Sequence, residues 1–172
     1  MTGNNPTDRS KLGTKRHILT DKEGIPLSAV ISSSSTHDIK LVTDVVDNAV
    51  ITRKKRKGRI KRQHLCLDKG YNSIQEEQEL IKRGYLLHIP IKKKKKKTRE
   101  EKEENGAVKQ EEGKVIPFCK KYSPKRWVVE RTNSWHNRFR KLFTRYEKKS
   151  DNYLGLVQFS CCIIIYRKII LG

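Results

Sequence analysis

Apolar residues in the first part of the chain follow the two-residue period of strands in some segments and the longer period of helices in others. Residues 15–21 and 25–32 are strand-like runs joined by residues 22–24. The glycine that closes this connection supplies the unusual backbone angle that tight turns need. We therefore predict a β-hairpin over residues 15–32, preceded by an irregular lead-in over residues 1–14.

The segment after the hairpin changes to helical spacing. Apolar side chains at intervals of three and four predict a helix over residues 39–49. Ser35, Thr36 or Asp38 could cap the start of this helix, because each has a side-chain oxygen that can accept a bond from an early backbone N–H.

A strand–helix–strand order follows. Residues 64–68 form an apolar run that ends on Asp68, residues 74–83 are predicted to be a helix closed by Gly84, and residues 85–91 are strand-like. This order implies two parallel strands with a right-handed crossover. Together with the hairpin, it predicts the α/β class: a mixed sheet with flanking helices.

Residues 92–117 have a different composition, with six consecutive lysines followed by a glutamate-rich stretch. Almost nothing in this segment is apolar, so we expect a disordered loop or a functional flap. Whether its lysines touch phosphates or are simply solvated stays open.

Two helices are predicted after this loop. The first begins near residue 125 and places an apolar stripe on one side, formed by Val128, Trp135, Phe139, Leu142 and Tyr146. Glu130 lies on nearly the opposite side. The second, residues 150–171, is apolar on most sides and is expected to be buried. The apolar run within it, residues 154–166, is interrupted by Gln158 and Ser160 and is too short to cross a bilayer.

The charge of the chain favours a nucleic acid partner. There are 40 lysines and arginines against 19 acidic residues, a formal net charge of +21. An excess of this size repels itself unless a polyanion neutralises it, so we favour DNA binding over a basic surface that only confers solubility. The four cysteines lack the spacing of a zinc site and are expected to be buried free thiols.

Asp68 and Glu130 are the candidate catalytic residues. Ligands gather at the carboxyl ends of strands in open α/β sheets, and Asp68 ends such a strand. Taken alone, each acid is more often structural. Phosphoryl transfer on DNA, however, needs hard oxygen ligands for Mg²⁺, and a strand-end aspartate with a later helical glutamate matches that need with one ligand missing.

Several motifs closely resemble bacterial insertion-sequence transposases of the DDE type. They are NPTDRSKLGTKRHILTD at residues 5–21, THD at 36–38, HLCLDKGY at 64–71, RWVVERTNSWHNRFR at 126–140, YEKK at 146–149 and NYLGLV at 152–157. The similarity covers nearly the whole chain except the lysine and glutamate loop. The motifs are specific in combination, although each alone would be weak.

This resemblance implies a ribonuclease H-like fold and a two-metal site for Mg²⁺ or Mn²⁺. It maps the second aspartate of the family onto Asp68 and its glutamate onto Glu130. Arg126 satisfies the family's arginine before the glutamate, while the later basic position holds Asn137, with Arg138 one place on. DNA is the implied partner, and the residues expected to contact it are Lys69, Lys125, Arg126, Arg131, Arg138, Lys141 and Arg145.

The first aspartate of the family, on a central strand before the hairpin, has no counterpart. Asp8 lies in an irregular setting, Asp21 belongs to the hairpin turn, and Asp38 is a capping candidate. Residues 1–172 are therefore expected to form the C-terminal portion of a catalytic domain that lacks its central strand. We expect this chain to be inactive alone, and its partners could include an N-terminal portion or a second transposase chain.

An alternative class is a non-enzymatic basic DNA-binding protein, such as a truncated transposase that competes for element ends. A sheet that binds RNA through aromatic residues is not supported, because no such strand motif occurs. Both favoured readings place the protein in the bacterial cytoplasm at the nucleoid, without a membrane partner.

Overall fold

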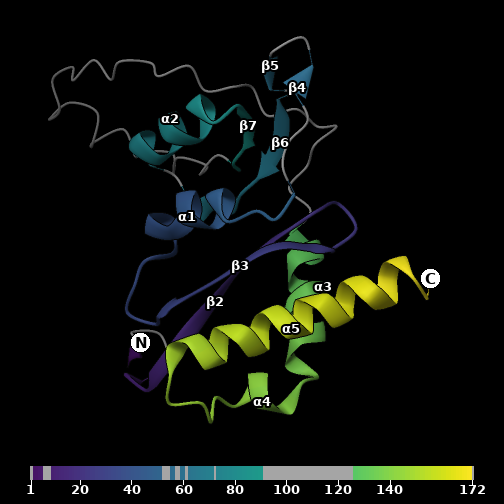
Figure 1. Cartoon of the computed structure of the whole chain (residues 1–172). Helices are drawn as coiled ribbons and strands as arrows, with labels where there is room; N and C mark the ends of the chain where they lie inside the picture. The colour runs from purple at the N-terminus through teal and green to yellow at the C-terminus, as the bar shows by residue number, and fades with distance from the viewer. Residues whose placement is uncertain are drawn as a thin grey trace, which may run out of the picture.

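A long antiparallel hairpin crosses the middle of the molecule. The computed structural model describes residues 2–5, 9–51, 55–56, 59–60, 62–71, 73–90 and 126–171. Within them, β2 (Leu12–Thr20) pairs with β3 (Pro26–Ser33), and the short β1 (Gly3–Asn4) pairs with the start of β2. Figure 1 shows the hairpin between two groups of elements, with α1 (Val42–Asp47) on one side and α5 (Ser150–Ile169) on the other.

The hairpin turn depends on the glycine that closes it, as the sequence predicts. Gly24 has a φ of 83°, a left-handed angle that favours glycine. The Asp21 carboxylate accepts hydrogen bonds from the backbone N–H groups of Glu23, at 2.9 Å, and Ile25, at 2.8 Å. The predicted hairpin is confirmed. The predicted irregular lead-in is partly wrong, because β1 adds a short strand there.

Alternate residues of β2 face two different cores. Leu19 packs against the cluster of Val42, Val46 and Leu65, whereas Ile18 packs against the cluster of helices α4 and α5. Because successive side chains of a strand point to opposite faces, Lys15, His17 and Leu19 share one face and Thr14, Arg16 and Ile18 share the other. We call these the α1 face and the α5 face.

The elements on the α1 face carry the parallel strands. The 3₁₀ helix η1 (Asp38–Leu41) and α1 (Val42–Asp47) follow the hairpin, and β6 (Gln63–Cys66), η2 (Lys69–Tyr71), α2 (Ile74–Lys82) and β7 (Tyr85–His88) come later. Strands β6 and β7 pair in parallel, as predicted. Leu80 and Leu87 complete the buried cluster, and β4 (Lys55–Arg56) and β5 (Arg59–Ile60) form a separate small ladder.

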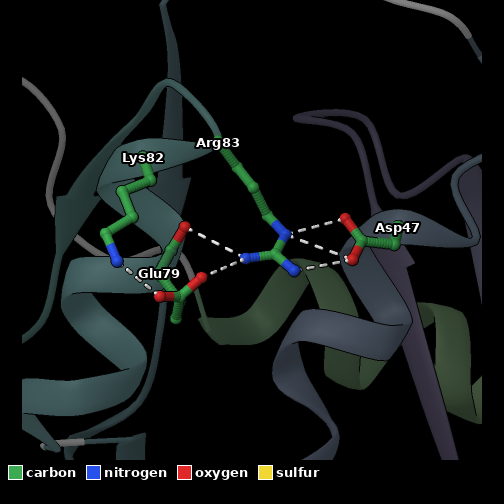
Figure 2. Close-up of polar contacts among 4 residues, drawn as sticks. All are labelled: Asp47, Glu79, Lys82 and Arg83. Carbon is green, nitrogen blue, oxygen red and sulfur yellow. Dashed lines mark hydrogen bonds and ion pairs between the residues drawn. The ribbon is translucent and has the colours of Figure 1, made fainter.

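An ion-pair network ties α1 to the end of α2 (Figure 2). The Arg83 guanidinium donates to the Asp47 carboxylate on one side, at 2.9 to 3.1 Å, and to Glu79 on the other, at 3.0 Å. Lys82 also reaches Glu79 at 2.8 Å. These hydrogen bonds from Lys82 and Arg83 hold the pKa of Glu79 below its usual range. The network fixes the helix that precedes β7, and Gly84, with a φ of 82°, ends that helix as predicted.

Three helices cover the α5 face: α3 (Arg126–Asn137), α4 (Arg140–Phe143) and α5 (Ser150–Ile169). Ile31 of β3 packs there with Leu142, Tyr153 and Val157. Thr132 of α3 donates a hydrogen bond to the Gly24 carbonyl at 2.7 Å, so α3 is also anchored to the hairpin turn.

Several sequence predictions need correction. The helix predicted from residue 125 breaks after Asn137, because Phe139 has extended backbone, and Tyr146 is 75% exposed instead of lying on the buried stripe. No described side chain caps η1, since Asp38 pairs with Lys15. Cys66 and Cys162 are exposed, and α5 has one buried face instead of being buried on most sides.

The class is mixed α/β, as predicted, but the described strands do not form one continuous sheet. The hairpin with β1, the β4–β5 ladder and the β6–β7 pair are three separate sheets. The predicted loop over residues 92–117 lies outside the described residues. None of the described helices is long and apolar enough to cross a membrane.

His136 connects α3 to α5 in the interior. Its side chain has no exposed surface, and its Nδ1 lies 2.9 Å from the Ser160 hydroxyl. That hydroxyl donates to the Val157 carbonyl, so it accepts from Nδ1–H, and Nε2 lies 3.7 Å from the Cys161 sulfur. Burial, with a smaller effect of the Arg16 charge, lowers the pKa of His136 to about 4.

Because the folded pKa of His136 lies below its unfolded value, the unfolded chain binds the proton more readily. We therefore predict that the stability contributed by neutral His136 is complete above pH ~6.5 and is lost as the pH falls toward 4, by up to about 3 kcal/mol. Urea unfolding across this pH range measures it. His136→Gln should flatten the dependence of stability on pH, whereas His37→Gln, which replaces an exposed histidine, should leave that dependence unchanged. Equal slopes of stability against pH in both variants would contradict the assignment to His136.

Candidate active site

Asp68 is held at the end of β6 by the start of η2. Its carboxylate accepts the backbone N–H of Lys69 at 2.8 Å, and its carbonyl accepts the N–H of Tyr71 at 3.0 Å. The strand continues to Leu67, which donates to the His88 carbonyl of the parallel neighbour β7. Asp68 thus stands at the carboxyl end of a parallel strand, as predicted, and its side chain is exposed.

A pocket of about 190 Å³ adjoins Asp68. It is lined by residues of β2, η1 and the β6–η2 connection, namely Lys15, His37, Asp38, Ile39, Asp68, Gly70 and Tyr71. Lys15 donates to the Asp38 carboxylate and to the Thr36 carbonyl, both at 2.9 Å. The pocket therefore joins the hairpin to the strand that carries Asp68.

Tyr71 shows that both aspartates act on the pocket. Burial, followed by the negative charges of Asp38 and Asp68, raises the pKa of Tyr71 to about 12. The phenol, which is protonated at neutral pH, can donate a hydrogen bond beside the two carboxylates. Sequence reasoning did not assign Lys15 or Tyr71 to the site, although both lie inside the quoted motifs.

Glu130 lies on α3, on the other side of the hairpin. Val128, Thr132 and His136 are the buried residues of this helix, and Glu130 is exposed on the side away from them. Helix α3 contacts β2 on the α5 face, where Arg16 donates to Asn137 at 2.6 Å. Lys15 contacts the Asp68 pocket from the α1 face. Asp68 and Glu130 are thus carried by elements that contact opposite faces of β2.

The candidate carboxylates are of the type that binds a divalent metal ion, but the described residues place too few of them together. Carboxylate oxygens are the ligands that Mg²⁺ and Mn²⁺ prefer. Within the described parts of the chain, however, no group of three or more His, Cys, Asp or Glu side chains is placed to hold a metal ion.

The predicted DNA-contacting residues are of three kinds: exposed residues, residues that make contacts within the protein, and residues outside the described part of the chain. Lys69, Arg138 and Lys141 are exposed. Arg131 stacks between Trp127, at 4.7 Å, and Trp135, at 5.0 Å, and donates to the Glu23 carbonyl. Arg145 donates to Thr14 and to the carbonyls of Glu147 and Lys148. Lys125 and the Arg126 side chain lie outside the described residues.

Comparison with known proteins agrees with the motifs. Residues 2–165 match the model of the family described as the transposase DDE domain, and the chain belongs to this family. It is 31% identical over 166 residues to a Burkholderia cepacia protein named as a transposase for insertion sequence element IS402, covering 96% of this chain and 68% of that protein. No solved structure matches significantly.

The arrangement of the pocket predicts that the charges of Asp38 and Asp68 change the pKa of Tyr71 measurably. Asp68→Asn and Asp38→Asn should each lower the pKa of Tyr71, because a phenolate forms more easily once a neighbouring negative charge is removed. Titration of the ring, with Tyr71→Phe to identify its signal, measures the effect. Asp44→Asn on α1 is the control, and a Tyr71 pKa unchanged in both pocket variants would contradict this geometry.

Proposed function

We propose that this chain is the C-terminal portion of a ribonuclease H-like catalytic domain, within an enzyme that cleaves and joins DNA strands during insertion-sequence transposition. Asp68 and Glu130 would be two of its three metal-binding carboxylates. Membership of the DDE transposase family supports the reaction class. The position of Asp68 at a strand end supports its role.

The observation that carries the proposed fold is the meeting of two separate sheets, the β2–β3 hairpin and the β6–β7 pair, at one pocket. Among the described strands, β2 pairs with β1 and β3, and β6 pairs with β7. Lys15 of β2 and Asp68 after β6 line one pocket, so these two strands approach each other there. One strand inserted between β2 and β6 would join the separate sheets into a single mixed sheet.

That strand is where the first aspartate of the family would enter. Placed between β2 and β6, it would end near Asp68 and on the side of the hairpin edge that α3 flanks. The metal would supply charge neutralisation at the reacting phosphate. The chain's own part would be to hold Asp68 through the Lys69 N–H and to place the Tyr71 phenol beside it.

The second candidate function is non-enzymatic DNA binding. The lack of a three-ligand group in the described residues favours it for this chain alone. The same basic surface would then occupy element ends without cutting them. Metal-dependent DNA cleavage would distinguish the enzyme from the non-enzymatic DNA-binding protein. Affinity for DNA would not, because both candidate functions predict it.

We predict duplex binding that weakens steeply as salt rises from about 50 to 200 mM, because bound phosphates displace counterions. Arg138→Ala with Lys141→Ala should lower the magnitude of the slope of log affinity against log salt by about 2. Fluorescence anisotropy measures it. The control, Lys22→Ala with Lys40→Ala, removes the same charge from other exposed positions and should change the slope less. A salt-independent affinity would refute the phosphate-contact model.

For activity, we predict that the isolated chain neither nicks nor joins supercoiled DNA in Mg²⁺ or Mn²⁺, and that it binds Mn²⁺ weakly. Calorimetric titration with Mn²⁺ and gel analysis of the plasmid provide the two readouts. Robust metal-dependent cleavage that Asp68→Ala abolishes would overturn this prediction and would indicate that another carboxylate completes the site. Asp44→Ala is the matched control.

A further inference from the structure

Two tryptophans and two cations form a stack on one side of α3. The Arg131 guanidinium lies over the Trp127 ring, 4.7 Å from its centroid, and over the Trp135 ring, 5.0 Å from its centroid. The Lys168 ammonium of α5 lies over Trp135 at 5.3 Å. Trp127, Arg131 and Trp135 follow one another at intervals of four, which makes them neighbours on the helix surface. We call these four residues the α3 stack.

The centre of the α3 stack is fixed to the hairpin turn. Arg131 donates a hydrogen bond to the Glu23 carbonyl, and a Cβ atom added at Gly24 would lie 3.0 Å from its guanidinium. None of the ion pairs found among the described residues involves Arg131 or Lys168. The α3 stack therefore holds its rings in place and presents two positive charges that no described carboxylate pairs with.

Trp127 is the open end of the α3 stack. It is 52% exposed although Arg131 covers one face of its ring, so the accessible part lies away from Arg131. Arg131 and Thr132 anchor α3 to the hairpin, and this anchoring does not require an indole one turn earlier. A single exposed apolar side chain is common, but this ring is held in one orientation over a cation. Such a ring can stack with a second flat group at a small cost in conformational entropy.

We propose that Trp127 binds an unpaired nucleobase of DNA by stacking, with Arg131 behind the indole ring. The charge of the chain selects this ligand, because a net charge of +21 and the two cations of the α3 stack favour a flat group carried on a polyanion. Bases inside a duplex are covered by their neighbours, whereas an unpaired base of any sequence has a free face. The α3 stack therefore fits a strand that is locally single-stranded.

The position of Trp127 relates this stacking site to the candidate catalytic glutamate. Glu130 is exposed and follows Trp127 by three residues, so the two side chains are neighbours on the surface of α3. A strand whose base stacks on Trp127 would thus pass beside Glu130. The inference rests on the proposed action on DNA, and it adds that the DNA is unpaired where it meets α3.

Oligonucleotide binding, measured by fluorescence anisotropy, separates stacking from charge. A roughly 12-nucleotide thymidine strand and an abasic strand of the same length carry the same phosphates and differ only in their bases. At about 0.2 M salt, where phosphate contacts are weakened, Trp127→Ala should raise the dissociation constant for the thymidine strand at least about fivefold and leave that for the abasic strand unchanged. Trp127→Phe should retain most of the affinity, because it keeps an aromatic face. The control, Phe143→Ala, removes another exposed aromatic ring and should change neither dissociation constant.

The fluorescence of Trp127 reports the contact directly. Trp135→Phe leaves Trp127 as the only tryptophan, because the chain has two. The thymidine strand should quench the emission of Trp127, whereas the abasic strand and a paired duplex of the same length should not. Equal quenching by the thymidine and abasic strands, or an equal effect of Trp127→Ala on both dissociation constants, would overturn the stacking proposal and leave DNA binding intact. A native chain that binds none of the three DNAs would overturn the proposed function as well.

Discussion

Burial of both faces of the β2–β3 hairpin is the constraint on which the rest of the structure depends. Ile18 and Leu19 are neighbours in sequence, yet they belong to two different hydrophobic clusters because strand side chains alternate. The Ser28 hydroxyl binds the Val45 carbonyl at 2.6 Å on one face, while Ala29 packs toward α5 on the other. A shift of one residue between the hairpin and its neighbours would exchange the two faces and disrupt both cores at once.

This two-sided burial also explains how the candidate site is arranged. Lys15 and Arg16 leave β2 in opposite directions, one to the pocket with Asp68 and the other to Asn137 on the helix that carries Glu130. The two candidate carboxylates therefore belong to elements that contact opposite faces of β2. The strand proposed to lie between β2 and β6 would approach both of these elements, so it would matter more to the site than any single side chain.

Local features of this fold could be predicted from the sequence, and long-range placement could not. Gly24 and Gly84 mark the hairpin turn and the end of α2 because left-handed backbone has a strong residue preference. The break after Asn137 was missed because Val128, Leu142 and Tyr146 keep helical spacing across it. Asp38 seemed a cap by local rules, but Lys15, 23 positions earlier, binds it instead. Membership of the DDE transposase family could be predicted from the sequence motifs. The pocket lined by Lys15 and Tyr71 could be found only from three-dimensional contacts.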